Sequence, residues 1–374
     1  MPWRIRMTIV AVHAVPVRLP YRTPMRMAAG DLTSAEHVIV QIHDDSGHVG
    51  ISEAPARPMF YGESPVSIVH AIEEWFGPSI TGADPVAVRR VMATLPRPAA
   101  NATARAAIDL ALHDLAARIF EVPLHRLLGG DSTPVRVSHA LGLGDPSALA
   151  DETAMMREKC GIDCFKVKAA GSIDADVAAI VAVREAAGDG ATVFVDANCA
   201  YYAHEGLKAI RRMYDAADIA WAEEPVRLDD PTGRARVAAE SPVPVLADES
   251  AMTAVDCART LAARHAHMLC VKPARSGVLG SLDVAGLGTA SGVKLVLGSQ
   301  GDSGIGAYAA LAIAAAHPAL STLPAELAYA LRLDGDVIDS AVEVVDGCMT
   351  PPSASGIGVR IDHDLLGRFR IDGR

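Results

Sequence analysis

The chain has 374 residues, of which 50% are hydrophobic and 4% aromatic, so its core must be built mainly from Ala, Val, Leu and Ile. The formal charge of −11 argues against nucleic acid as a partner, although a local cation can still hold an anionic substrate. The longest apolar run, around Ala307–Ala316, is shorter than the roughly 18 residues that span a bilayer, so we expect no membrane partner.

The six cysteines include no CxxC pair and no cluster with zinc-finger spacing, which indicates ordinary reduced thiols. Thiols stay reduced in an intracellular compartment. The first seven residues are too short and too interrupted for a signal peptide. Together these features predict a cytoplasmic protein.

Residues 1–130 are predicted to form an α+β unit. A hairpin is expected because two β-branched runs flank an Asp-Ser-Gly turn, and two helices are expected from apolar residues at helical spacing. Gly129-Gly130 marks the end of the unit. The predicted strands and helices are Val38–Ile42, Val49–Ile51, Ser67–Phe76 and Ala102–Phe120.

Residues 131–332 alternate between short apolar runs and Ala-rich helical stretches, which is typical of a closed parallel barrel of the TIM type. Residues 333–374 carry a Pro-Pro turn and are predicted to return to the first unit. The eight runs are Val135–Leu141, Cys164–Lys168, Val193–Asp196, Ile219–Glu223, Val243–Asp248, Met268–Lys272, Lys294–Gly298 and about Leu320–Leu323. The intervening helices are expected at Asp174–Ala187, Glu205–Ala216, Asp230–Glu240, Ala254–Arg264 and Ser281–Ser291.

Polar residues end five consecutive runs of the predicted barrel at steps of 28, 27, 25 and 24 residues. Side chains at successive strand ends of such a barrel meet at one mouth. A further lysine lies two residues before the first of them and therefore faces the same side of its strand. The pattern gathers three carboxylates and three lysines around one space: Lys166, Lys168, Asp196, Glu223, Asp248 and Lys272.

The three carboxylates predict a metal site. Oxygen anions converging without His or Cys suit a hard divalent cation, with Mg²⁺ first. Any one of them alone has a plainer interpretation, because an acidic residue at a strand end commonly caps the next helix. The neighbouring Glu224 and Glu249 point the other way along their strands and are expected to have supporting roles.

The lysines predict proton transfer. A charged side chain inside a barrel is costly and needs a reason, although each lysine alone is more simply explained as a surface residue. Lys272 belongs to the sixth run and faces the second run across an eight-membered ring. A carboxylic acid bound to a divalent cation has an acidified α-proton, and two lysines on opposite faces can remove or return it.

These residues resemble the enolase superfamily, and within it the muconate-lactonizing subgroup, whose sites pair a lysine or histidine base with Mg²⁺. The resemblance covers nearly the whole chain and rests on several motifs together. They are Arg22–Gly30 with Gly62-Glu63-Ser64, Ala106–Asp114, Lys166-Val167-Lys168, Val195–Asn198, Ala222–Pro225, Ala247–Ser250, Val271-Lys272 and Gly356–Val359.

The resemblance implies a modified (β/α)7β barrel with an N-terminal α+β capping domain that the C-terminal tail completes. It implies Mg²⁺ or Mn²⁺ bound by the three carboxylates, Lys168 as the acid/base, Lys166 modulating it, and Lys272 facing it across a small carboxylic acid. It also implies a symmetric homo-oligomer, an octamer or a dimer. Residues expected near the substrate are Asn198, Asp302 in place of the usual glutamate, Tyr61 in the capping loop from Arg57, and His139, for which a packed core histidine is the alternative.

The absence of a histidine base on the seventh run disfavours dehydratase and mandelate-racemase chemistry. The leading hypothesis is cycloisomerisation of cis,cis-muconate to muconolactone through a stabilised enolate. The alternatives are an N-acylamino acid racemase or o-succinylbenzoate synthase, and then a dipeptide epimerase, which Leu323–Leu327 disfavours because it lacks an Asp-x-Asp pair. A non-catalytic binding protein is a further alternative, against which the intact lysines argue.

Overall fold

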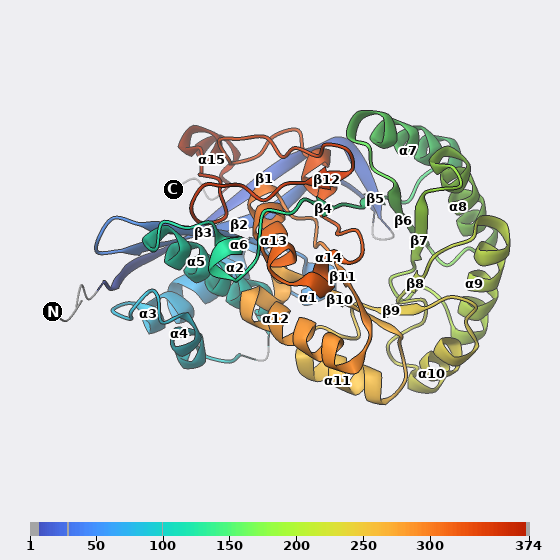
Figure 1. Ribbon diagram of the computed structural model, residues 1–374, viewed down its shortest axis with the longest axis horizontal. Helices are drawn as coiled ribbons and strands as arrows, with labels where there is room; N and C mark the ends of the chain where they lie inside the picture. Colours follow the sequence, from blue (N-terminus) through green and yellow to red (C-terminus); the bar gives the residue numbers. More distant parts are fainter. Residues whose placement is uncertain (1–6, 28–29, 99, 372–374) are drawn as a thin grey trace.

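The computed structural model describes residues 7–27, 30–98 and 100–371 (Figure 1). The N-terminal part begins with an antiparallel sheet in the order β1-β2-β3. β2 pairs with both neighbours, and its Val38 lies opposite Pro16 of β1 and Ala54 of β3. The strands run over Ile9–Met27, Gly30–Asp44 and Val49–Pro55. The predicted hairpin is confirmed, whereas the long strand β1 was not predicted.

Helix α5 (Ala102–Ile119) packs against this sheet and against α12 (Pro273–Ser291), and nearly all of its residues are buried, as expected for a helix that is covered on several sides. Ile108 of α5 shares an apolar core with Val40 of β2. Gly50 of β3 permits the close approach, since a Cβ there would clash with the Ala111 carbonyl. The other helix predicted for this part, Ser67–Phe76, is present as two consecutive helices, α2 (Pro65–His70) and the π-helix η1 (Ala71–Phe76). The remaining short helices of this part are α1 (Pro58–Tyr61), α3 (Gly77–Ile80), α4 (Val88–Thr94) and α6 (Leu124–Leu127).

The C-terminal part is a curled parallel sheet of seven strands in the order β11-β10-β9-β8-β7-β6-β5. Helices α7 to α11 follow one another around its outside (Figure 1). The strands are β5 (His139–Leu141), β6 (Cys164–Lys168), β7 (Thr192–Asp196), β8 (Ala222–Glu223), β9 (Val245–Ala247), β10 (Met268–Val271) and β11 (Lys294–Leu297). The helices are α7 (Pro146–Cys160), α8 (Ile173–Ala187), α9 (Ala203–Ala217), α10 (Pro231–Glu240), α11 (Ala254–Ala262), α12 (Pro273–Ser291) and α13 (Gly304–Ala316).

The eighth predicted strand, about Leu320–Leu323, is wrong. That stretch begins within the short helix α14 (Pro318–Ser321). The ring is closed instead by the next residues, because Ala325 bonds through its backbone to Arg136 and Ser138 while the Glu326 amide donates to Leu297 of β11. The prediction from apolar composition placed the closing segment a few residues too early. The true position is set by backbone pairing with the first and the last strand regions of the ring, which composition does not show.

An apolar layer fills the barrel below its mouth. Phe194 stacks on Trp221 with ring centroids 4.4 Å apart, and Leu246 and Val296 join the same buried cluster. Phe194 and Asp196 lie two residues apart on β7, so both face the barrel interior. The polar residues at the strand ends therefore rest on a packed floor, which restricts their positions.

The tail after residue 332 runs back along the N-terminal sheet. Leu333 and Arg370 form antiparallel bridges to Tyr21 and Val17 of β1. The tail also contributes β12 (Cys348–Met349), which pairs with β4 (Val135–Arg136), and the helix α15 (His363–Phe369). The three-part division at residues 130 and 332 stays a prediction. Among the described residues, no helix is long and apolar enough to cross a membrane.

Candidate active site

Sheet register brings the predicted residues together. Lys168 at the end of β6 lies opposite Asp196 of β7, and Asp196 lies opposite Glu223 of β8. Asp248 directly follows β9, and Lys272 directly follows β10. The near-constant sequence step thus becomes an arc of side chains at the carboxyl ends of five adjacent strands, as the sequence predicted.

Lys166 lies at the centre of the carboxylates. Its Nζ is 3.0 Å from an oxygen of Asp196, 3.0 Å from one of Glu223 and 2.8 Å from one of Glu326. Burial by itself would lower the pKa of Lys166, but these three carboxylates raise it well above its ordinary value. The buried lysine is therefore held as a cation.

Lys168 is more accessible, with 20% of its side chain exposed. Its Nζ donates to Asp196 and to the Oδ1 of Asn198, both at 2.6 Å. The Asn198 amide nitrogen in turn donates to Glu249 at 2.7 Å, so Asn198 orients the lysine from the far side. Burial, followed by repulsion from Asp248, raises the pKa of Glu249 to about 7.

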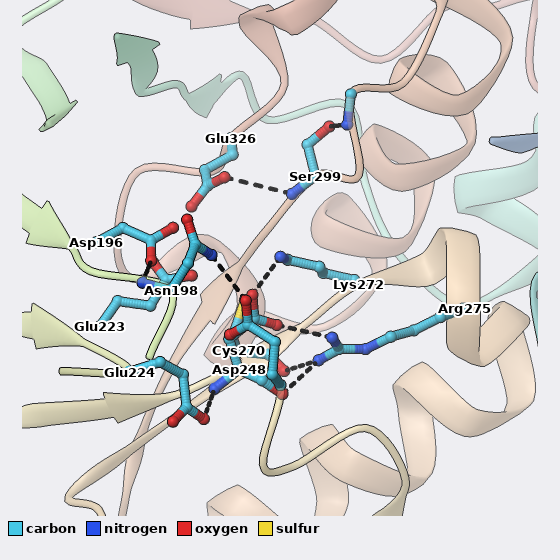
Figure 2. A network of polar contacts seen from close by, with 12 residues as sticks. Asp196, Asn198, Glu223, Glu224, Asp248, Cys270, Lys272, Arg275, Ser299 and Glu326 are labelled. Atoms are coloured by element: carbon cyan, nitrogen blue, oxygen red, sulfur yellow. Dashed lines mark hydrogen bonds and ion pairs between the residues drawn. The ribbon is translucent and has the colours of Figure 1, made fainter. Parts of the chain in front are cut away.

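Lys272 pairs with Asp248 on the opposite side of the ring (Figure 2). Arg275, one helical turn further along α12, pairs with the other oxygen of Asp248 at 2.7 Å. Glu224 holds the backbone of Asp248 in place, because its carboxylate accepts hydrogen bonds from the backbone amides of Asp248 and Ser250 at 2.7 and 2.9 Å. The supporting role predicted for Glu224 agrees with these contacts.

The three lysines of the site line an inner cavity of about 110 Å³, whereas the carboxylates of Asp196, Glu223 and Asp248 lie outside its lining. The barrel contributes Lys166, Lys168 and Lys272 to its lining, and the N-terminal part contributes Arg57, Phe60 and Tyr61. A wider outer cavity of about 570 Å³ adjoins it and shares Arg57, Phe60, Lys168 and Asn198 with it. The site is therefore built by both parts of the chain.

The other residues predicted to contact substrate differ in placement. Asn198 and Tyr61 line the inner cavity, and the Tyr61 hydroxyl accepts from Arg275 at 3.2 Å. Asp302 is buried and does not line the inner cavity, and its carboxylate accepts a hydrogen bond from the Ser299 hydroxyl at 2.6 Å. His139 does not line this cavity; its ring bonds Glu152 at 2.6 Å, so the alternative of a packed core histidine fits the structure better.

Several residues in or beside the site were not predicted to contribute to it as they do. Glu326 follows an apolar run as the other carboxylates do, but the misplaced eighth strand hid this signal. Arg275 has the signal of helical spacing, three residues after Lys272. Ser299 and Gln300 lie two and three residues after the end of β11, beyond the strand-end position that identified the lysines. Glu249 lines the cavity in addition to bonding Asn198.

The acidic cluster is able to hold a metal ion. Glu223 and Asp248 bring carboxylate oxygens, together with the sulfur of Cys270, within 4.8 Å of one another. Asp196 adjoins Glu223 in the sheet register. Buried oxygen donors of this kind suit a hard divalent cation, and lysines paired to the same oxygens show how strongly the site favours positive charge.

A barrel with acid and amine side chains at the carboxyl ends of its strands, under an α+β cap, defines an enolase-type protein. Residues 148–365 match the family described as enolase C-terminal domain-like, and residues 9–129 match the mandelate racemase / muconate lactonizing enzyme N-terminal domain. The chain therefore belongs to the mandelate racemase / muconate lactonizing enzyme family of the enolase superfamily, as the sequence motifs predicted.

Relatives with different activities are similar to this chain. A chloromuconate cycloisomerase of Pseudomonas putida is 32% identical, over 97% of this chain and 99% of the relative. The crystal structure of a muconate lactonizing enzyme from Mycobacterium smegmatis, complexed with muconolactone, is 35% identical with a TM-score of 0.94, over 98% of this chain and 100% of the other. An N-succinyl-L-Arg/Lys racemase of Bacillus cereus is 26% identical over 98% of both. With such relatives, the chain is an isomerase.

Proposed function

We propose that the protein removes or delivers a proton α to a carboxylate, and that its reaction is the reversible closure of cis,cis-muconate to muconolactone. One observation carries the proposal: Lys168 and Lys272 line the same small cavity from strands four places apart in the barrel. Amines on opposite faces of a bound acid are suited to acid/base chemistry at its α-carbon.

The roles of the amines follow from their contacts. Lys168 is partly accessible and held by Asn198, which suits a group that exchanges a proton with substrate. Lys166 is buried among three carboxylates and provides fixed positive charge beside it. In lactone closure, a carboxylate oxygen adds to the conjugated alkene and an ammonium delivers one proton to the α-carbon. In the reverse direction, the amine removes that proton as the ring C–O bond breaks.

Asp196, Glu223 and Asp248 are proposed to hold Mg²⁺ or Mn²⁺ as a resident cofactor. When bound, such an ion stabilises the negative charge that develops on the substrate carboxylate during proton removal. Cys270 near two of these ligands does not change the choice, because oxygen donors still dominate the set. Arg275 fixes the orientation of Asp248 and so limits where an ion can bind.

The test is to add muconate to the Mg²⁺-loaded protein and to follow the loss of diene absorbance. Turnover that depends on the metal supports the proposal. No turnover of muconate, together with clear turnover of an N-acylamino acid, would instead identify the second candidate. That candidate is an N-acylamino acid racemase, measured by deuterium incorporation at the α-carbon and loss of optical rotation.

The second candidate is favoured by a specific observation. The inner cavity adjoins a wider outer cavity lined by apolar residues such as Leu32, Met59 and Leu143, which offers room for an acyl chain. A dipeptide epimerase is less favoured, because Glu326 is the carboxylate of the closing segment at the cavity and it already pairs with Lys166. No second carboxylate of Leu323–Leu327 is available for a substrate ammonium group.

A further inference from the structure

We propose that Asp176 and Tyr201 are positioning residues, which join the loops after β6 and β7 and thereby hold Lys168 in contact with Asn198. The inference rests on the proposed function, in which Lys168 exchanges a proton with the substrate. It goes further by tracing the placement of this lysine to two buried side chains that line neither the inner nor the outer cavity.

Asp176 is the first observation. It lies in the first turn of α8, and it is only 6% exposed. Its two carboxylate oxygens accept hydrogen bonds from the backbone amides of Ala170 and Gly171, at 3.0 and 3.1 Å. Bonds to an ionised acceptor are stronger than those between neutral groups, so they fix the backbone that donates them. That backbone begins two residues after Lys168.

The neighbouring Asp174 shows what is particular to Asp176. Acidic residues in the first turn of a helix are commonly explained by their attraction to its positive end. That explanation is sufficient for Asp174, whose side chain is 88% exposed and pairs with Arg212 of α9. It is insufficient for Asp176, because burying a carboxylate is costly unless specific partners compensate for the lost water. The partners of Asp176 belong to the two loops.

Tyr201 is the second, independent observation. It belongs to the loop after β7, is 2% exposed, and donates its hydroxyl to the Oδ2 of Asp176. Its backbone is fixed on the other side, where it bridges to Val226 and accepts from the amide of Arg227 at 3.2 Å. A buried hydroxyl needs a partner, so the ring and the carboxylate hold each other in place. Tyr201 thus anchors the joined loops to the loop after β8.

The joined loops carry the proton-transfer pair. Lys168 is the last residue of β6, and Asn198 lies two residues after the end of β7. The Lys168 Nζ donates to the Oδ1 of Asn198 at 2.6 Å. The loops also pack closely at Gly171, where φ is +88° and an added Cβ would lie 3.3 Å from the carbonyl oxygen of Ala200. A shift of one loop against the other therefore separates the lysine from the amide that orients it.

Lys272 is positioned by different contacts. It follows β10 and pairs with Asp248, which Arg275 also holds. β10 lies four places from β6 and three from β7 in the strand order. Lys272 is therefore an internal reference, because loss of the link between the two loops should disturb Lys168 and leave Lys272 in place.

The first measurement is steady-state turnover of cis,cis-muconate by the full-length variants with saturating Mg²⁺. Tyr201→Phe removes one hydroxyl and keeps the buried ring, whereas Asp176→Ala removes the whole carboxylate. We expect kcat to fall about tenfold in Tyr201→Phe and further in Asp176→Ala, with KM within about twofold, because a misplaced catalytic group costs rate more than binding. Asp176→Asn keeps one acceptor oxygen and should recover part of the loss.

A double-mutant cycle tests whether Tyr201 acts through the partner of the lysine. If it does, Tyr201→Phe should lower kcat much less in an Asn198→Ala background than in the wild-type protein. Equal effects in the two backgrounds would overturn the inference, because they would make Tyr201 a general support of the barrel.

The second measurement depends on no reaction of a substrate. Reductive methylation, quantified for each lysine by peptide mass spectrometry, reports how freely its amine reaches solvent. We expect Tyr201→Phe and Asp176→Asn to raise the methylation rate of Lys168 severalfold and to leave that of Lys272 unchanged.

Two matched controls change the same kinds of group at exposed positions. They are Asp174→Asn on α8 and Tyr214→Phe on α9, where 40% of Tyr214 is exposed. Both should keep the wild-type kcat and the wild-type methylation rates. If Asp176→Ala does not fold, Tyr201→Phe decides the question, since it removes a single oxygen atom.

Failure of the positioning role and failure of the proposed function give different results. If no muconate is consumed but Lys168 is methylated faster in the variants, the positioning role stands and the proposed reaction is wrong. If muconate is consumed and Tyr201→Phe and Asp176→Asn keep the wild-type kcat, the reaction stands and the positioning role is wrong. The role is also wrong if kcat falls while the methylation of Lys168 stays as in wild type.

Discussion

The two walls of the cavity are built on different principles. The barrel wall places Lys166, Lys168 and Lys272 on strand ends fixed by sheet register, over a packed floor. The cap wall places Phe60 and Tyr61 on the four-residue helix α1, and 43% of Phe60 is exposed. A rigid wall can hold reacting groups in place, whereas a thinly packed loop can change its side chains at small cost in stability. We therefore expect the barrel wall to carry the chemistry and the cap wall to select the substrate.

Removing a barrel lysine should have the largest effect. Lys168→Ala and Lys272→Ala are each expected to lower α-proton exchange by about 10²–10⁴-fold, since each removes a general acid or base. Deuterium incorporation followed by NMR measures this loss. Lys208→Ala, at an exposed position of α9, is the matched control and should retain full activity. If both lysine variants retained α-proton exchange, the lysines of the barrel wall would not be the proton-transfer groups.

Metal removal should have the next largest effect. At a free Mg²⁺ concentration about 100 times the dissociation constant, the ion should raise the free energy of unfolding by about 2.7 kcal/mol, and a chelator should remove this gain. Asp248→Asn should not respond to Mg²⁺, because it loses one proposed ligand. Asp283→Asn, exposed on α12, should respond as wild type does. Denaturant titrations with and without Mg²⁺ measure both, and an equal response of the two variants would contradict the metal assignment.

A pH effect should come from the capping domain. His37 is fully buried on β2, and burial, followed by the charge of Arg57, lowers its pKa well below the ordinary 6.5. A group with a lowered folded-state pKa binds its proton more readily when unfolded. The protein should therefore lose stability as pH falls below about 6.5, by at most about 1.4 kcal/mol per pH unit.

His37→Gln isolates this contribution. A carboxylate oxygen of Glu53 lies 3.5 Å from the Nδ1 of His37. Burial, followed by the charge of Asp302, raises the pKa of Glu53 above its ordinary value of 4.5. Above pH 4.5 Glu53 therefore makes stability fall as pH rises, which is opposite to the effect of His37. The difference between wild type and variant between pH 5 and pH 8, measured by urea unfolding, should show the histidine slope. Parallel stability curves for the two proteins would exclude the titration of His37 as its source.

The smallest effect is expected at Phe60. Because its side chain is 43% exposed, Phe60→Ala should change the free energy of unfolding by less than about 0.5 kcal/mol. The same variant should alter KM severalfold with little change in kcat, since Phe60 lines both cavities but carries no group that can transfer a proton. Steady-state kinetics on muconate and on an N-acylamino acid measure the shift in preference. A large fall in kcat would give the cap a part in the chemistry.

The sequence predicted the residues of the barrel wall well but not those that complete it. Periodic strand ends identified Lys168, Asp196 and Glu223, because each lies where a short apolar run stops. Glu326 follows the same rule but was hidden by the misplaced eighth strand. Gln300 lies three residues after β11 and is neutral, so no charge at a strand end indicated it. His139 was predicted near the substrate, with a packed core histidine as the alternative, and its ring bonds Glu152 and does not line the cavity.

The sequence by itself determined the order of strands and helices and the acid and amine residues at the strand ends, because hydrophobic period and spacing are local properties of the chain. Tertiary structure alone decided where the ring closes, which polar atoms stay without partners, and how Arg57 meets the loop after β11. Those features depend on contacts between residues far apart in sequence, such as Arg57 and Gly301, and no local pattern encodes a distance across the barrel.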